Sequence, residues 1–308
     1  MYNKIKRGDI LIYTVTLNPA LDYVLKVNKL SFNDINRADE TELFFGGKGI
    51  NVSAVLNELE CDNIALGFVG GFSGNKLEKM LEKANIKTDF VHINDETRIN
   101  VKIRYGNELD INAEGPEISE EDIEELMKKL ERIEEGDFLV LAGSVPKNLP
   151  SDIYERIMQK LSNGGINFVV DAEGELLLNS LKYKPFLIKP NHHELGALFK
   201  ASANKDEVIN NARKLKEAGA KNVLVSLAEN GAVLLDETNT VHNIKNAKGE
   251  LVNSVGCGDS MIAGFIAGYI KTGDYSYALK LGTACGNATA YSDKLAGINE
   301  INELIQKL

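Results

Sequence analysis

The chain has 308 residues, of which 44% are hydrophobic and 26% charged, with a net charge of −10 at neutral pH. This length and composition fit one large or two smaller globular domains. The acidic balance argues against nucleic acid or an anionic membrane surface as the main partner, since both need a basic footprint. A small anionic substrate is not excluded, because it responds only to local charge.

The cysteines and the N-terminal residues favour a cytoplasmic location. Cys61, Cys257 and Cys285 are odd in number and have no CxxC spacing, so neither a disulfide framework nor a zinc site is indicated. The N-terminus is basic and precedes a short apolar stretch, but no small-residue cleavage site follows before Asp22, so no signal peptide is expected. No apolar run approaches the length of a membrane span.

Strand-like and helix-like patterns alternate along most of the chain. Runs that are apolar on both faces, as in a covered parallel sheet, lie at 10–17, 63–70, 137–143, 166–172, 185–191, 222–228 and 231–236. Helical spacing of apolar residues is found at 50–59, 119–133, 153–161, 208–215 and 261–270. The clearest helix has a capping-box-like start at Ser119 and Asp122. The alternation predicts a doubly wound α/β sandwich.

Two segments depart from this alternation and predict a small accessory sheet. We expect it to comprise 21–45 and 93–114, inserted into a core of 1–20, 46–92 and 115–308, with a two-residue hairpin turn at Gly106-Asn107. Its apolar face carries Ile99, Val101, Ile103 and Tyr105, joined by Tyr23, Leu25 and Val27, and its opposite face carries Arg98, Lys102 and Arg104. The apolar face is too small to be stable uncovered.

A glycine-rich turn near the C-terminus is the first candidate site. NSVGCGDSMIAGF, 253–265, places Gly256, Cys257 and Gly258 directly before Asp259 and a helical run. Asp259 and Ser260 are good helix caps, which is one interpretation. The other is an anion site with an acid ready to accept a proton, because bare N–H groups and the positive end of the helix dipole meet there. At a helix N-terminus, the pKa of the Cys257 thiol is expected to be lowered.

Other motifs are weighed against simpler interpretations. FFGGKGINVS, 44–53, is a second glycine turn but not a Walker A loop, and GFVGGFSG, 67–74, lacks the dinucleotide spacing and predicts a strand-to-helix turn. Asn191 and Glu194 lie three residues apart past a strand end, where they suit either magnesium-bound waters or a helix cap. His192 and His193 are interpreted as structural, since Ala197 stands where a zinc-protease helix needs its second histidine.

Taken together, GGKGIN, NHHE and NSVGCGDS resemble the signatures of the ribokinase-like (phosphofructokinase B-type) carbohydrate kinases, from Ile10 onward. YTVTLNPALD, ETRINVKI, LAGSVPKNLP and KPFLIKPNHHEL are most similar to the bacterial 1-phosphofructokinase branch. The resemblance implies a three-layer α/β/α sandwich with a β-sheet lid. It also implies Mg²⁺-dependent transfer of the ATP γ-phosphoryl group to the 6-hydroxyl of fructose 1-phosphate. Tagatose-6-phosphate kinases share most of these motifs and are the close alternative.

The resemblance assigns roles to individual positions. Asp259 falls on the catalytic base, and Gly256, Cys257 and Gly258 fall on the anion hole. The sugar side comprises Asp22, Gly46, Gly47, Lys48, Asn51, Ser144, Arg98 and Arg37, with Arg98 and Lys48 the first choices for the sugar phosphate and Arg37 the third. The nucleotide side comprises Lys189, Ser226, Gly231, Asn253, Gly258 and Asn287, and the magnesium handle comprises Asn191 and Glu194.

Three positions depart from the family pattern. Asn253-Ser254 replaces a common Asp-Thr, which weakens the case for potassium activation. Cys257 replaces a common alanine, and Ala228 stands where the nucleotide turn usually has glycine.

Two other classes of function and one mode of assembly follow from the same residues. A non-catalytic sugar-phosphate or nucleotide sensor on this fold is disfavoured because it needs no base. A nicotinamide-dependent oxidoreductase is disfavoured because the sequence lacks the dinucleotide-binding fingerprint.

The sandwich cannot cover the apolar face of the accessory sheet if the cationic face of that sheet is turned toward the site. The sequence therefore predicts a homodimer in which two copies of that sheet cover each other.

Overall fold

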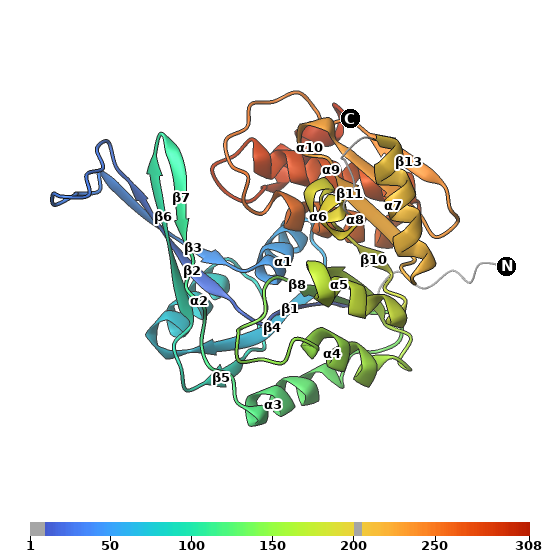
Figure 1. The fold of residues 1–308 in the computed structure, drawn as a ribbon, viewed down its shortest axis with the longest axis horizontal. Helices are drawn as coiled ribbons and strands as arrows, with labels where there is room; N and C mark the ends of the chain where they lie inside the picture. Colours follow the sequence, from blue (N-terminus) through green and yellow to red (C-terminus); the bar gives the residue numbers. More distant parts are fainter. Residues whose placement is uncertain (1–9, 200–204) are drawn as a thin grey trace.

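The computed structural model describes residues 10–199 and 205–308. Within them, nine strands form a central sheet in the order β13-β12-β11-β10-β9-β8-β1-β4-β5 (Figure 1). Their bounds are β1 (Ile12–Thr16), β4 (Asn63–Gly70), β5 (Val91–Ile93), β8 (Phe138–Ala142), β9 (Asn167–Asp171), β10 (Leu187–Ile188), β11 (Asn222–Ser226), β12 (Ala232–Leu235) and β13 (Val241–Ile244). The predicted strands are all present, and β5 and β13 are additional.

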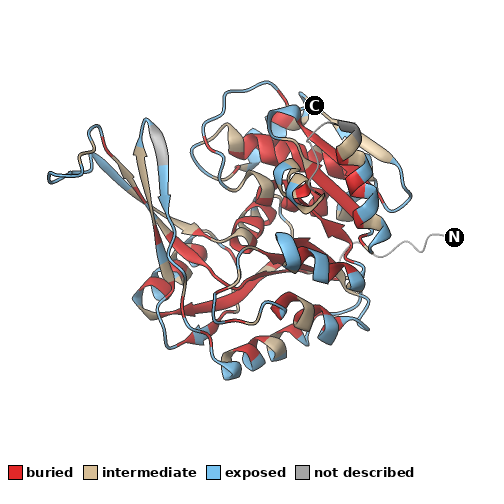
Figure 2. Ribbon diagram, viewed as in Figure 1, coloured by how far each residue is buried: buried red, intermediate tan, exposed pale blue. Residues whose placement is uncertain are grey.

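Helices cover both faces of this sheet, and the core lies in the two layers between. One face packs against α1 (Lys48–Glu58), α2 (Gly71–Lys83), α8 (Cys257–Thr272), α9 (Tyr275–Ala290) and α10 (Ile298–Ile305). The other packs against α3 (Glu120–Leu130), α4 (Ile153–Leu161), α5 (Gly174–Ser180), α6 (His192–Phe199) and α7 (Lys205–Glu217). Buried strands lie between helices whose outer surfaces are exposed (Figure 2). The predicted three-layer sandwich is confirmed.

The end of the sheet beyond β11 differs from the predicted parallel arrangement. β12 pairs antiparallel with β11, and β13 pairs antiparallel with β12. Only a short turn that includes Ala228–Asn230 joins β11 to β12, and a parallel connection needs a far longer crossover. The interpretation of 231–236 as a strand of a covered parallel sheet is therefore wrong, although the sandwich itself is as predicted.

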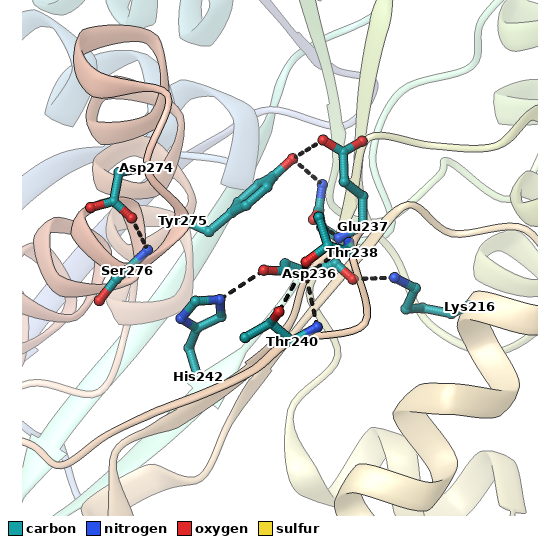
Figure 3. A network of polar contacts seen from close by, with 10 residues as sticks. Lys216, Asp236, Glu237, Thr238, Thr240, His242, Asp274, Tyr275 and Ser276 are labelled. Atoms are coloured by element: carbon teal, nitrogen blue, oxygen red, sulfur yellow. Dashed lines mark hydrogen bonds and ion pairs between the residues drawn. The ribbon is translucent and has the colours of Figure 1, made fainter.

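A polar network holds that antiparallel edge together (Figure 3). The buried Asp236 carboxylate accepts hydrogen bonds from Thr238 and from the backbone N–H of Thr240, and its second oxygen lies 2.8 Å from His242 Nε2. Burial favours the protonated acid, but the bonds from His242 and Thr238 outweigh it and hold the pKa of Asp236 below its ordinary value. Next to it, the Tyr275 hydroxyl donates to Glu237 at 2.8 Å, which ties the turn to the start of α9.

A separate sheet stands beside the sandwich and forms the lid. It contains β2 (Ala20–Lys26), β3 (Glu40–Gly46), β6 (Arg98–Tyr105) and β7 (Asn107–Ile111), in the order β3-β2-β6-β7 (Figure 1). β2 and β6 run parallel at its centre, and their register pairs Tyr23 with Val101 and Leu25 with Ile103. The two apolar patterns therefore share one face, as predicted. The prediction of a two-residue turn at Gly106-Asn107 is wrong, because Tyr105 pairs with Asn107 and leaves only Gly106 between them.

The strand order places a crevice at the carboxyl edge of the main sheet. From β1 the chain builds outward through β4 and β5 on one side, and from β8 to β11 on the other. In such a doubly wound sheet, ligands bind beyond the carboxyl ends of the strands where the order reverses. The lid strands β2 and β3 follow β1 directly, and β6 and β7 follow β5. The fold thus predicts a site between the lid and the carboxyl ends of β1, β8 and their neighbours.

No helix in the two described ranges is long and apolar enough to cross a membrane. The basic N-terminal residues lie outside these ranges.

Candidate active site

A cleft of about 1460 Å³ lies at this carboxyl edge. Most predicted site residues line it: Asp22, Gly47, Lys48, Asn51, Arg98, Ser144, Lys189, Asn191, Glu194, Ser226, Gly231, Gly256, Cys257, Gly258, Asp259 and Asn287. They come from the lid, from the strand ends and the loops after them, from the N-termini of α1, α6 and α8, and from α9. The fold therefore gathers residues that are spread over most of the sequence.

Three predicted residues do not line this cleft. Gly46 lies behind Asp22, where a side chain would not fit: a Cβ there would lie 2.9 Å from the Asp22 carboxylate. Asn253 lines a second cavity of about 400 Å³, which shares Asp22 and Asn51 with the main cleft. Arg37 is exposed on the loop between β2 and β3 and lines neither cavity.

Asp259 is a buried carboxylate in the first turn of α8. It is 5% exposed, and its Oδ2 accepts a hydrogen bond from Asn51 Nδ2 at 2.8 Å. Burial and the nearby charge of Asp171 raise its pKa to about 6, against the opposing effects of Asn51, Lys48 and Lys189. No side chain caps the N-terminus of α8, so the helix-cap interpretation of Asp259 is wrong. The carboxylate instead faces groups of the cleft.

The turn before Asp259 has the geometry of an anion site. Gly256 is the N-cap of α8 with a φ of 80°, a left-handed conformation that glycine adopts without strain. Lys189 Nζ approaches the turn so closely that a Cβ on Gly258 would lie 2.9 Å from it. The free N–H groups of the helix start and this buried ammonium group therefore converge at one place.

Asp171 also lines the cleft, and the sequence motifs did not predict it. It ends β9, is 2% exposed, and lies 3.3 Å from Lys48 Nζ and 3.4 Å from Lys189 Nζ. Burial favours its protonated form, but Lys189 and Lys48 outweigh this and hold its pKa below the ordinary value. Burial tends to lower the pKa of Lys48, yet Asp171 and Asp259 raise it overall. The sequence did contain a signal for it, since Asp171 is the one acidic residue in the otherwise apolar run at 166–172.

The expectation for the Cys257 thiol is wrong. Burial, followed by the charge of Asp259, raises its pKa to about 11. Its Sγ lies 3.4 Å from the Asn253 carbonyl oxygen, an acceptor that favours the protonated thiol. The helix dipole does not overcome these effects.

Asn191 and Glu194 cap α6 and line the cleft at the same time. Glu194 accepts from the Asn191 backbone N–H at 2.8 Å and from Asn191 Nδ2 at 2.7 Å, and the Glu194 N–H donates to Asn191 Oδ1 at 2.8 Å. Burial raises the pKa of Glu194. The described residues contain no cluster of three or more His, Cys, Asp or Glu suited to a metal. One cleft carboxylate with an amide fits Mg²⁺, which keeps most of its water ligands. Beside them, the ring centroids of His192 and His193 lie 3.9 Å apart, with the two rings tilted by 38°.

The two ends of the cleft differ in character. At one end, Asn287 accepts a hydrogen bond from the Ala247 N–H at 2.8 Å and donates one to Asn246 Oδ1 at 3.0 Å. It therefore fixes a loop whose residues Asn246 and Ala247 line the cleft. Ala228 in the adjoining turn has a φ of 48°, which explains why glycine is favoured there.

The lid closes the opposite end of the cleft. Asn100 donates to Asp22 at 2.8 Å, and the Arg98 guanidinium donates to the Asn18 and Ala113 carbonyl oxygens. Both Asp22 and Arg98 line the cleft, so this end offers a carboxylate for hydroxyl groups and a guanidinium for an anion.

Known proteins match this chain over nearly all its length. The model of the pfkB family of carbohydrate kinases matches residues 15–299. A 1-phosphofructokinase of Bacillus subtilis is 43% identical over 97% of this chain and 98% of that protein. A D-tagatose-1-phosphate kinase of Bacillus licheniformis is 35% identical over 97% and 98%. The tetrameric inhibited form of phosphofructokinase-2 from Escherichia coli has a TM-score of 0.90 at 26% identity, covering 97% of this chain and 99% of that one. The chain belongs to the pfkB family of carbohydrate kinases.

Proposed function

We propose that this enzyme transfers the γ-phosphoryl group of ATP to the 6-hydroxyl of fructose 1-phosphate, giving fructose 1,6-bisphosphate, with Asp259 as the general base. The observation that carries the proposal is the buried Asp259 carboxylate beside the glycine turn that begins α8. The cleft of about 1460 Å³ exceeds the roughly 300–1,000 Å³ typical of a single small ligand. It has room for a nucleotide and a sugar phosphate together.

The proposed reaction uses groups that already lie together. The sugar O6–H bond breaks and its proton passes to Asp259, while O6 bonds to the γ-phosphorus and the bond to the β–γ bridging oxygen breaks to release ADP. With a pKa of about 6, Asp259 is mostly ionised at neutral pH and basic enough to accept that proton. The N–H groups of Gly256, Cys257 and Gly258, with Lys189, stabilise the charge on the transferring group.

The remaining assignments divide the cleft into a sugar side and a nucleotide side. Asp22 and Asn51 bind sugar hydroxyls, and Arg98 with Lys48 binds the sugar phosphate. Arg37 is assigned a weaker role there, because it lies outside the cleft lining. Lys189, Ser226, Gly231 and Asn287 hold ATP. Asn191 and Glu194 would hold Mg²⁺ through its waters, and the ion would neutralise charge on the ATP phosphates when bound.

A tagatose-phosphate kinase is the second candidate, because a relative with that name is 35% identical over nearly the whole chain. A panel of fructose 1-phosphate, fructose 6-phosphate, tagatose 6-phosphate and tagatose 1-phosphate, with ADP release as the readout, separates the two. We expect the highest kcat/KM with fructose 1-phosphate. A higher value for either tagatose phosphate would replace the first proposal by the second.

The base is tested by Asp259→Asn, which keeps the size of the side chain. Turnover should fall at least about a hundredfold, the low end for loss of a general base, while ATP and sugar phosphate still bind. A purified variant with a tenth of wild-type turnover would exclude Asp259 as the base.

The lid face supports the proposed homodimer. Tyr23, Ile99, Tyr105, Leu109 and Ile111 are between 36% and 54% exposed on the lid strands. A soluble monomer rarely exposes such a contiguous apolar area, and a second lid placed by two-fold symmetry would cover it. The tetrameric relative supports assembly in general, and the lid contact is our proposal.

A further inference from the structure

The N-termini of two helices meet at Asp259. Asn51 lies in the first turns of α1, Asp259 lies in the first turn of α8, and the two residues are 208 positions apart in the chain. Asn51 is 8% exposed and Asp259 is 5% exposed, and 2.8 Å separates Asn51 Nδ2 from Asp259 Oδ2. A neutral side chain therefore donates a hydrogen bond to the buried acid from across the cleft.

Only one orientation of the Asn51 amide suits an ionised acid. Its NH₂ group donates to the carboxylate, whereas the opposite orientation would set two acceptor oxygens against each other. With Oδ2 held in this way, Asp259 keeps its other oxygen for a substrate hydroxyl. The bond thus fixes which oxygen of the carboxylate is available to the substrate.

The other groups that face Asp259 have opposing effects on its ionisation. Burial and the Asp171 carboxylate, from the end of β9, favour the protonated acid. Lys48 from α1 and Lys189 after β10 favour the ionised acid, but Asp171 lies between them and pairs with both. Asn51 acts on Asp259 directly at hydrogen-bond distance, which makes its contribution distinct from that of the lysines.

The segment that carries Asn51 leaves the lid. β3 ends at Gly46, and α1 begins two residues later at Lys48, with the Asn51 N–H bonded to the Gly47 carbonyl oxygen at 2.9 Å. The residue that contacts the base is therefore attached, within one helical turn, to the sheet that closes over the sugar.

We propose that Asn51 is a positioning residue for phosphoryl transfer, in addition to any contact with the sugar. It holds the Asp259 carboxylate in one orientation and in its ionised form, while the free oxygen receives the hydroxyl proton. This proposal rests on the proposed function of Asp259 as the base.

The test is the pH dependence of kcat and of the sugar KM in Asn51→Ala and Asn51→Asp. Loss of the donor in Asn51→Ala should move the acid limb of kcat to higher pH by about one unit. In Asn51→Asp, two adjacent carboxylates must share a proton, so the limb should move further, by about one to two units. A raised sugar KM with an unmoved kcat limb in both variants would overturn the proposal, because a simple sugar contact predicts that result.

Asn57→Ala is the matched control. Asn57 lies on the same helix and donates to the Ala84 carbonyl oxygen at 3.1 Å, away from Asp259. It should leave the acid limb in place. A shift as large as that in Asn51→Ala would attribute the effect to α1 in general and overturn the proposal.

A double mutant separates the two proposals. If Asn51 acts through Asp259, adding Asn51→Ala to Asp259→Asn should lower kcat by less than about twofold beyond the single variant, since groups acting as one unit are not additive. A full additive loss would overturn the role of Asn51 alone. High activity in Asp259→Asn would instead refute the base itself.

Discussion

Asp171 offers the sharpest test of the electrostatics, because one buried acid pairs with two lysines from distant parts of the chain. We expect Asp171→Asn to fold but with a much lower free energy of unfolding. The substitution keeps the shape of the side chain and removes its charge. Lys189, whose side chain is 6% exposed, then loses the acid that lies 3.4 Å from it.

The two lysines contribute unequally to the expected loss. Removing one partner of a buried ion pair costs about 3–5 kcal/mol, because the other charge stays buried and unpaired. The Lys189 pair falls in this class. The Lys48 side chain is 37% exposed, so water screens its pair and we expect less than about 1 kcal/mol from it. The Asp259 carboxylate still attracts Lys189 in this variant and is freed of the repulsion from Asp171. The total should therefore lie near the lower end of the range, at about 3 kcal/mol, set mainly by Lys189.

Urea denaturation followed by circular dichroism measures this difference, since the chain has no tryptophan for fluorescence. Asp89→Asn is the matched control. Asp89 also pairs with two cations, Lys129 at 2.7 Å and Arg132 at 2.5 Å, but its side chain is 29% exposed. It should cost less than about 1 kcal/mol. Equal losses in the two variants would refute the argument that burial makes Asp171 distinctive.

Four further outcomes are expected. Because the pKa of Asp259 is raised to about 6 and our proposal has it act when ionised, kcat/KM should fall about tenfold from pH 7 to pH 5; a flat profile would contradict this. Arg98→Ala should raise the KM for sugar phosphate about 30-fold, because a charged hydrogen bond worth about 2 kcal/mol is lost, and it should change the KM for ATP little. A raised KM for ATP with an unchanged KM for sugar phosphate would contradict the assignment of Arg98 to the sugar phosphate. Val101→Asp should dissociate the proposed homodimer and weaken sugar-phosphate binding, whereas a fully active wild-type monomer of 33.8 kDa by light scattering would exclude the proposed lid contact. Cys257→Ala should stay active, and alkylation of the wild-type thiol near pH 7 should be slow because its pKa is about 11; rapid loss of activity would show that the thiolate is formed.

Local patterns were enough to predict much of this fold. The strand at 63–70 and the helix at 153–161 match β4 and α4 at both ends, since apolar periodicity and flanking turns define them within a few residues. The direction of the strands in the sheet was harder to predict. The run at 231–236 is apolar on both faces, and such a pattern does not distinguish a parallel strand from an antiparallel one. The short connection between β11 and β12 did indicate an antiparallel pair, because a parallel pair needs a longer crossover.

The site was harder to predict from the sequence than the fold, because its contacts join segments that are distant in the chain. The pairing of Lys48, Asp171 and Lys189 depends on β9 lying next to β10, and the bond between Asn51 and Asp259 spans 208 residues. Motifs predicted Lys48, Asn51, Lys189 and Asp259 as site residues but not their contacts with one another, and they did not predict Asp171. The pKa of Cys257 also depends on burial and on Asp259, which outweigh the helix terminus that the sequence shows.

The lid is built from two separate excursions of the chain that meet in a parallel pair. Its central contacts, such as that between Asp22 and Asn100, join residues 78 positions apart. Closing so long a loop costs entropy before the strands gain any pairing energy. The lid strands also carry half-exposed apolar side chains, whereas the strands of the central sheet are buried between helices. We therefore expect the amide hydrogens of the lid strands to exchange before those of the sandwich. The sheet beside the cleft should thus open at a lower cost in free energy than the sandwich to which it is attached.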